Sequence, residues 1–152
     1  MPDFIQHCGV CCNAEKDSAI VAAKFNHGGP IAEIPGGAVA VPYSDQSGLD
    51  RAIRDALGAC IYELEYNYKD SKPSDWPSFQ ESGYKTIRKF EADYVCLRIR
   101  GTNARNIHFL LESPSFGMNS LRLASTVNPG ASDFGSAVHQ IYEQFLKLRS
   151  QV

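Results

Sequence analysis

Residues 94–100 read YVCLRIR and residues 107–112 read IHFLLE, and the polar segment GTNARN at residues 101–106 separates them. Within residues 94–100, Val95, Leu97 and Ile99 alternate with mostly polar neighbours, which is the period of a β-strand with one buried face. Gly and Asn favour turns. The three segments therefore predict an antiparallel hairpin, and residues 121–127 (LRLASTV) predict a third strand that continues it as a meander.

Two amphipathic helices accompany this predicted meander. Apolar residues recur at steps of three and four before it, at Leu49, Ala52, Ile53, Ala56, Leu57, Cys60, Ile61 and Leu64. A similar stripe after the meander includes Phe134, Val138, Ile141 and Phe145. Residues 18–25 and 38–43 predict two further strands, and Pro35, Gly36 and Gly37 between them predict a turn. We expect one α+β domain over residues 1–152, with a helix layer on a mostly antiparallel sheet.

The charge balance argues against several classes of partner. The 152 residues carry 15 Lys and Arg against 17 Asp and Glu, a net charge of -2. Nucleic-acid binders and polybasic membrane-surface proteins usually have a clear basic excess. No apolar run approaches the roughly 20 residues that a membrane helix needs. We therefore expect neither a direct nucleic-acid partner nor a membrane partner.

Five cysteines, at positions 8, 11, 12, 60 and 96, are an odd number without the spacing of a disulfide framework. The first ten residues also lack the pattern of a secretory signal, so we expect a reducing cytoplasm and free thiols. Cys8 and Cys11 form a C-x-x-C pair, but a zinc site needs two more ligands at a suitable spacing. We expect small, partly buried thiols and neither a metal nor a cofactor. The alternative is a small thiol- or metal-dependent enzyme that uses Cys8, Cys11, Cys12 and a histidine.

No catalytic motif stands out elsewhere, and we expect no catalytic residues. His108 is predicted to face solvent, and His139 to be a partly buried structural residue of the last helix. A group of cations is interleaved with Tyr84 and Tyr94, namely Lys85, Arg88, Lys89, Arg98, Arg100 and Arg105. Acidic residues lie among them, at Glu81, Glu91 and Asp93, so we interpret the group as a mixed solvated face. An RNA contact is the weaker interpretation.

The central part of the chain resembles a bacterial family. The helix at residues 49–64 is followed by DWP at 75–77, and SGYKTIRKFE at 82–91 leads into the strand at 95–99. This order over residues 47–146 is similar to that of CdiI-type immunity proteins of contact-dependent growth inhibition (CDI) systems. The resemblance implies a non-catalytic cytoplasmic protein. Its partner would be the toxic C-terminal domain of a cognate effector, often a nuclease, which it binds and neutralises.

If the resemblance holds, a polar loop is the candidate toxin-binding surface. It carries Asp70, Asp75, Trp76 and Glu81, which its composition leaves exposed. Acidic groups suit the basic substrate-binding surface of a nuclease, and an exposed Trp is a common interface anchor.

Overall fold

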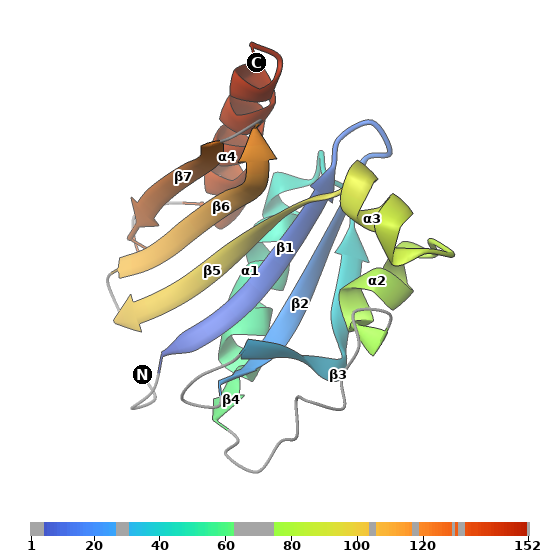
Figure 1. The fold of residues 1–152 in the computed structure, drawn as a ribbon. Helices are drawn as coiled ribbons and strands as arrows, with labels where there is room; N and C mark the ends of the chain where they lie inside the picture. The colour runs from blue at the N-terminus through green and yellow to red at the C-terminus, as the bar shows by residue number, and fades with distance from the viewer. Residues whose placement is uncertain are drawn as a thin grey trace.

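The described residues are 5–26, 31–62, 75–103, 106–116, 119–128, 130 and 133–151 of a computed structural model (Figure 1). The strands are β1 Gln6–Asn13, β2 Ser18–Asn26, β3 Ile31–Val41, β4 Ile61–Tyr62, β5 Val95–Asn103, β6 Asn106–Phe116 and β7 Asn119–Val127. The helices are α1 Gln46–Ala59, α2 Pro77–Ser82, α3 Ile87–Asp93 and α4 Phe134–Arg149.

The described strands form a single sheet in the order β3-β2-β1-β5-β6-β7, and β4 adds a short parallel pairing to β2. All other pairings are antiparallel. The α+β prediction and the predicted meander of β5, β6 and β7 are therefore confirmed. The strand β1, at the start of the chain, pairs between β2 and β5 and so joins the N-terminal strands to the meander.

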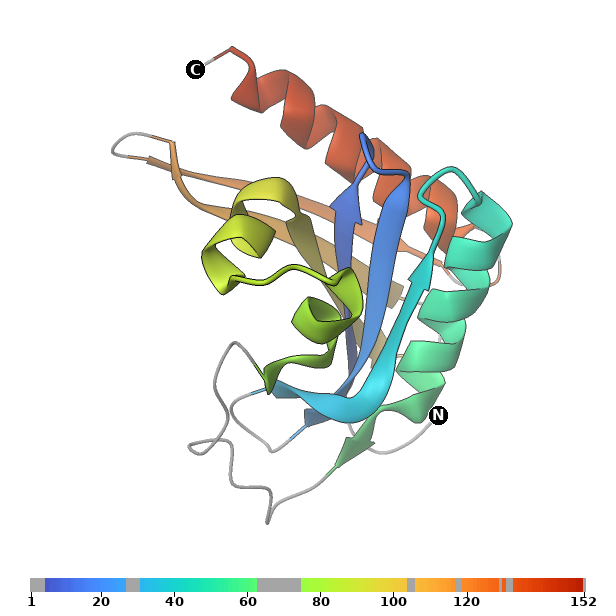
Figure 2. The ribbon, with the colours of Figure 1, turned by 90° about the vertical axis from the view of Figure 1, so that its right-hand side faces the viewer.

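Helices lie on both sides of the sheet, whereas the sequence predicted a single layer. The long helices α1 and α4 cover one face, and the short helices α2 and α3 lie on the other (Figure 2). The main core forms beneath α1 and α4, around fully buried residues such as Val10, Leu49, Ile99, Phe109 and Phe134. The second helix layer was not predicted because α2 and α3, at six and seven residues, are too short for a clear periodic stripe.

The helix α1 ends earlier than its apolar stripe predicted. Its buried residues are those expected, from Leu49 to Leu57, but Cys60 has extended backbone angles and caps the helix. Ile61 then lies in β4, where it pairs with β2 and is 46% exposed. The prediction of Ile61 as a core position was wrong because strand pairing with β2 replaces the last helical turn. Leu64 lies outside the described residues.

The predicted turn at Pro35, Gly36 and Gly37 is part of β3. The pairing of β3 with β2 shifts register between Ala22 and Lys24 and continues on both sides, so the extra residues form an irregular bulge. Gly36 has a φ of 71°, a left-handed conformation that glycine adopts without strain. A Gly-rich segment therefore bends this strand without ending it.

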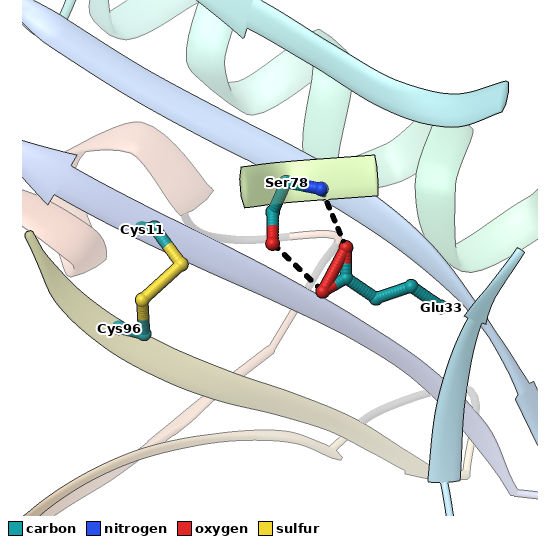
Figure 3. Close-up of a disulfide and its surroundings, with 4 residues drawn as sticks. All are labelled: Cys11, Glu33, Ser78 and Cys96. Atoms are coloured by element: carbon teal, nitrogen blue, oxygen red, sulfur yellow. Dashed lines mark hydrogen bonds between the residues drawn. A yellow bond between two sulfur atoms is a disulfide. The ribbon is translucent and has the colours of Figure 1, made fainter. Parts of the chain in front are cut away.

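Cys11 and Cys96 form a disulfide, contrary to the expectation of free thiols (Figure 3). The two residues are direct partners in the pairing of β1 with β5, and their Cα atoms lie 3.9 Å apart. Their sequence separation of 85 hid this relation, because only the order of strands in the sheet places β1 beside β5. Cys8, Cys12 and Cys60 are free and buried.

We expect the disulfide to stabilise the fold, because it closes a loop of 85 residues in the unfolded chain. Chain-entropy reasoning gives about 4.5 kcal/mol for a loop of this length. Urea unfolding should show the loss when the protein is reduced with dithiothreitol. A Cys96→Ser variant should be less stable and insensitive to dithiothreitol. Detection of five reactive thiols in the unreduced, unfolded protein would contradict the disulfide.

Candidate functional site

The sequence predicts a polar loop as the partner-binding surface, but part of that segment forms the helix α2, which includes Glu81. The structure also shows how α2 is attached to the sheet. The carboxylate of Glu33, on β3, accepts hydrogen bonds from the backbone N–H and the hydroxyl of Ser78, both at 2.7 Å (Figure 3). The Phe79 side chain is buried beneath the helix. Pro77 occupies the first turn, where the absence of an N–H costs nothing. A polar contact, from Ser78 to Glu33, and an apolar contact, from Phe79, therefore attach α2 to the sheet.

Three of the four predicted contact residues lie together on this short segment. Asp75 and Trp76 immediately precede α2, Glu81 lies near its end, and all three are exposed. Trp76 is 38% exposed, which leaves part of its surface available to a partner. Asp70 lies outside the described residues. We call the surface of Asp75, Trp76, Gln80 and Glu81 the α2 surface.

The aromatic residues near the predicted basic group belong to a small second core. Tyr94 and Phe79 pack with Phe90, Cys11 and Ile20 between the sheet and the short helices, and Tyr84 borders them. The Tyr94 hydroxyl donates to Ser18 Oγ at 3.0 Å. Tyr94, which the sequence interleaves with the cations, is buried because α3 covers that position. The two tyrosines are therefore structural, which removes the stacking groups that the RNA interpretation needed.

A shallow pocket of about 370 Å³ lies beside this second core, and it carries Lys16, Lys85 and Lys89. Its charge is partly neutralised. Asp93 accepts a hydrogen bond from Tyr84 at 2.8 Å and lies 3.3 Å from the Lys89 ammonium. The Lys16 ammonium lies over the Tyr84 ring and donates to its hydroxyl. Lys16 and Lys89 therefore each have a partner within this group, while Lys85 is exposed at the rim of the pocket.

The N-terminal cysteines do not converge on a reactive site. They lie on β1, where successive side chains point to opposite faces. Cys8 and Cys12 are buried in the main core, whereas Cys11 lies on the other face in its disulfide. Burial raises the pKa of Cys8 and of Cys12 to about 12. In the described part of the chain, no three His, Cys, Asp or Glu residues are placed to hold a metal ion.

The face of the sheet opposite α1 and α4 is left open over β5, β6 and β7 (Figure 1). Strand pairing aligns two rows of residues across this open face. One row is His7, Arg100, His108 and Thr126, and the other is Gly9, Arg98, Leu110 and Ala124. The arginines and His108 are exposed, which confirms the prediction for His108. We call this set, together with Arg122, the open face.

The absence of a side chain at Gly9 leaves room beside this row for Lys24. A Cβ atom there would lie 3.0 Å from Cε of Lys24, so the aliphatic part of the Lys24 side chain crosses the strand at this glycine. Lys24 is half-buried, and burial is the main factor that lowers the pKa of its ammonium. Because Glu33 opposes that shift, the positive charge of Lys24 is partly offset. The exposed charge of the open face is thus carried by arginines.

The surroundings of His7 on the open face lower the pKa of its imidazole. Burial, with smaller contributions from Arg100 and Lys24, lowers the pKa of His7 to about 4. Its neighbour in the register is Arg100. The imidazole is therefore neutral at physiological pH, because a proton on it would be poorly solvated and would meet a fixed positive charge.

The sequence grouped Arg98 and Arg100 with the lysines of residues 85–89, but the arginines lie on β5 whereas Lys85 and Lys89 line the pocket. Alternation along residues 94–100 correctly placed both arginines on the polar side of their strand. The proximity of His7 was missed because it depends on the pairing of β1 with β5. Arg105 lies outside the described residues. His139 is half-buried and its ring stacks on Tyr43 with centroids 4.1 Å apart, which confirms its structural role.

The lowered pKa of His7 predicts a pH dependence of stability. The unfolded chain binds a proton on His7 near its ordinary pKa of 6.5, whereas the folded protein binds it only near pH 4. The stabilisation of the folded state that is linked to His7 is therefore complete above pH 6.5. It is lost as the pH falls toward 4, because the unfolded chain then binds the proton more tightly. An NMR titration of the imidazole should also show a higher pKa in Arg100→Gln than in the wild type. An equal rise in Arg51→Gln, on α1, would show that the effect is not local.

The buried thiols predict resistance to alkylation. Because only the thiolate reacts, the folded protein at pH 7.5 should leave Cys8 and Cys12 unmodified by excess iodoacetamide, as judged by peptide mass spectrometry. The unfolded protein serves as the control, and both residues should react there within minutes. Rapid modification of either thiol in the folded state would restore the thiol-enzyme alternative.

Comparison with known proteins places this fold beside two solved structures. No protein-family model matches the sequence, and no curated protein matches it. The protein of unknown function NMB0488 from Neisseria meningitidis superposes with a TM-score of 0.68 at 13% identity, over 95% of this chain and 97% of that one. A chain of the CdiA-CT/CdiI toxin and immunity complex from Yersinia pseudotuberculosis superposes with a TM-score of 0.60 at 15% identity, over 92% and 97%. The chain therefore shares its fold with a component of a CDI toxin–immunity complex.

Proposed function

We propose that this chain is an immunity protein that binds and neutralises the toxic C-terminal domain of a cognate CDI effector. The observation that carries the proposal is the fold that it shares, over nearly the full length of both chains, with a chain of a toxin and immunity complex. The order of motifs in residues 47–146 pointed to the same family independently of the structure. The partner is a protein domain, and a nuclease is the activity that we expect of it.

The proposal includes the absence of covalent chemistry in this chain. The alternative, an enzyme based on the N-terminal cysteines, requires a reactive thiolate or a cluster of ligands. Cys8 and Cys12 are buried with raised pKa values, and Cys11 is bonded to Cys96. Thiolate chemistry at these residues therefore has no support in the folded protein. A rigid sheet with charged, exposed surfaces suits a protein that acts by occupying the surface of another.

We place the site of action in the bacterial cytoplasm, where a delivered nuclease would meet its substrate. In the described part of the chain, none of the helices has the length and apolar character to cross a membrane. The reducing cytoplasm opposes the Cys11–Cys96 disulfide. Binding experiments should therefore be run with and without dithiothreitol, so that both states of the protein are tested.

The direct test is complex formation with the C-terminal domain of an effector that is encoded beside this chain. The purified proteins should form a 1:1 complex with a Kd of about 1 µM or tighter. Expression of this chain should also restore growth to cells that produce the domain. Failure to bind, in both redox states, together with failure to restore growth, would reject the proposed function.

We expect the α2 surface to contribute to this complex. A variant with Asp75→Asn and Glu81→Gln should associate with a basic toxin domain several times more slowly, because two attractive charges are removed. Trp76→Ala should instead speed dissociation, since it removes an apolar anchor. Stopped-flow or biolayer measurements would separate the two rates. Asp55→Asn with Glu143→Gln, on α1 and α4, removes the same charge from the opposite side. Equal kinetics in both double variants would exclude the α2 surface.

A further inference from the structure

The open face is unusual in this molecule because its charge opposes that of the whole chain. The chain has a net charge of -2. The sequence of β1, β5, β6 and β7 nevertheless carries a single carboxylate, Glu112, whereas Arg98, Arg100 and Arg122 are exposed on one face of those strands. Arg122 is opposite Glu112 in the register, so the centre of positive charge lies at Arg98 and Arg100.

Strand pairing places a glycine, a leucine and two histidines beside these two arginines. Their direct partners across the strands are Gly9 and His7 on one side and Leu110 and His108 on the other. The environment of His7 keeps its imidazole neutral, and the His108 ring is paired with the Thr126 hydroxyl at 3.0 Å. None of these four cross-strand neighbours of Arg98 and Arg100 is a carboxylate.

The guanidinium groups of Arg98 and Arg100 favour carboxylates as partners. Arginine presents a planar array of donors that matches a carboxylate in a bidentate arrangement. Nucleic acid is the other polyanion to consider, but its single strands are usually held by exposed aromatic rings. None of the described side chains of the open face is Phe, Tyr or Trp, and Tyr84 and Tyr94 belong to the second core. The acidic balance of the chain also opposes nucleic-acid binding.

We propose that the open face, centred on Arg98 and Arg100, docks a carboxylate-rich surface of the partner protein. The inference rests on the proposed function for the identity of that partner, the toxin domain. The open face and the α2 surface lie on the same side of the sheet, with α2 toward β3 and the open face toward β7 (Figures 1 and 2). One partner can therefore meet a positive and a negative surface together. Opposite charges at the two ends allow only one orientation of docking.

The test compares two double variants with the same change in charge. Arg98→Glu with Arg100→Glu reverses the open face, and Arg51→Glu with Lys147→Glu reverses two exposed cations on α1 and α4. Association with the toxin domain should slow about tenfold or more in the first variant and much less in the second. The dependence of the rate on salt should also weaken only in the first. If thermal unfolding shows that the Arg98→Glu with Arg100→Glu variant does not fold, Arg98→Gln with Arg100→Gln replaces it. This neutral variant should have an intermediate effect on the association rate. Equal rates and salt dependence in the open-face and control variants would overturn the inference while leaving the proposed function intact.

A second probe separates the inference from the proposed function. Poly-glutamate and a uridine oligonucleotide of equal charge are titrated against the wild type and both charge-reversed variants at low salt. Tighter binding of poly-glutamate, lost only when the open face is reversed, supports the inference even if the toxin domain does not bind. Tighter binding of the oligonucleotide at the same residues would overturn it in favour of a nucleic-acid surface, and equal binding of poly-glutamate by all three proteins would also overturn it.

Discussion

The strand β1 lies between β2 and β5, and the alternation of its side chains divides the molecule into two environments. Cys8, Val10 and Cys12 point into the main core beneath the long helices, while His7, Gly9 and Cys11 belong to the opposite face. Because the side-chain period of a strand is two, a shift of one residue would exchange these sets and place His7 and Cys11 in the core. The burial of the main core therefore fixes which groups reach the open face.

This division explains why the cysteine-rich segment at residues 7–12 forms no reactive site. Three cysteines and a histidine within six residues suggest a metal or redox centre when they are read as a loop. On a central strand the same residues are separated by the sheet itself, and two of the thiols are held neutral by burial. The third forms a covalent bond to the adjacent strand. The chemistry of the segment is thus structural, and the features left for function are surfaces.

Two surfaces of opposite charge lie on the side of the sheet that carries the short helices. The α2 surface is positioned by the bonds of Ser78 to Glu33 and by the burial of Phe79. The open face is positioned by the register of β1, β5, β6 and β7. Both therefore lie on firmly paired elements, and a partner that binds them pays little for ordering the chain. This arrangement is consistent with a protein that binds another through complementary charge.

The amino-acid sequence by itself determined the α+β class, the meander and the inward faces of β5 and the long helices, because those depend on periods of two and 3.6 residues within one segment. It also placed Asp75, Trp76 and Glu81 on an exposed segment. Only the tertiary structure decided that β1 pairs with β5, which creates the disulfide of Cys11 with Cys96 and sets His7 beside Arg100. It alone decided that α3 covers Tyr94. These relations join residues far apart in the chain, and no local pattern encodes which strand becomes the neighbour of which.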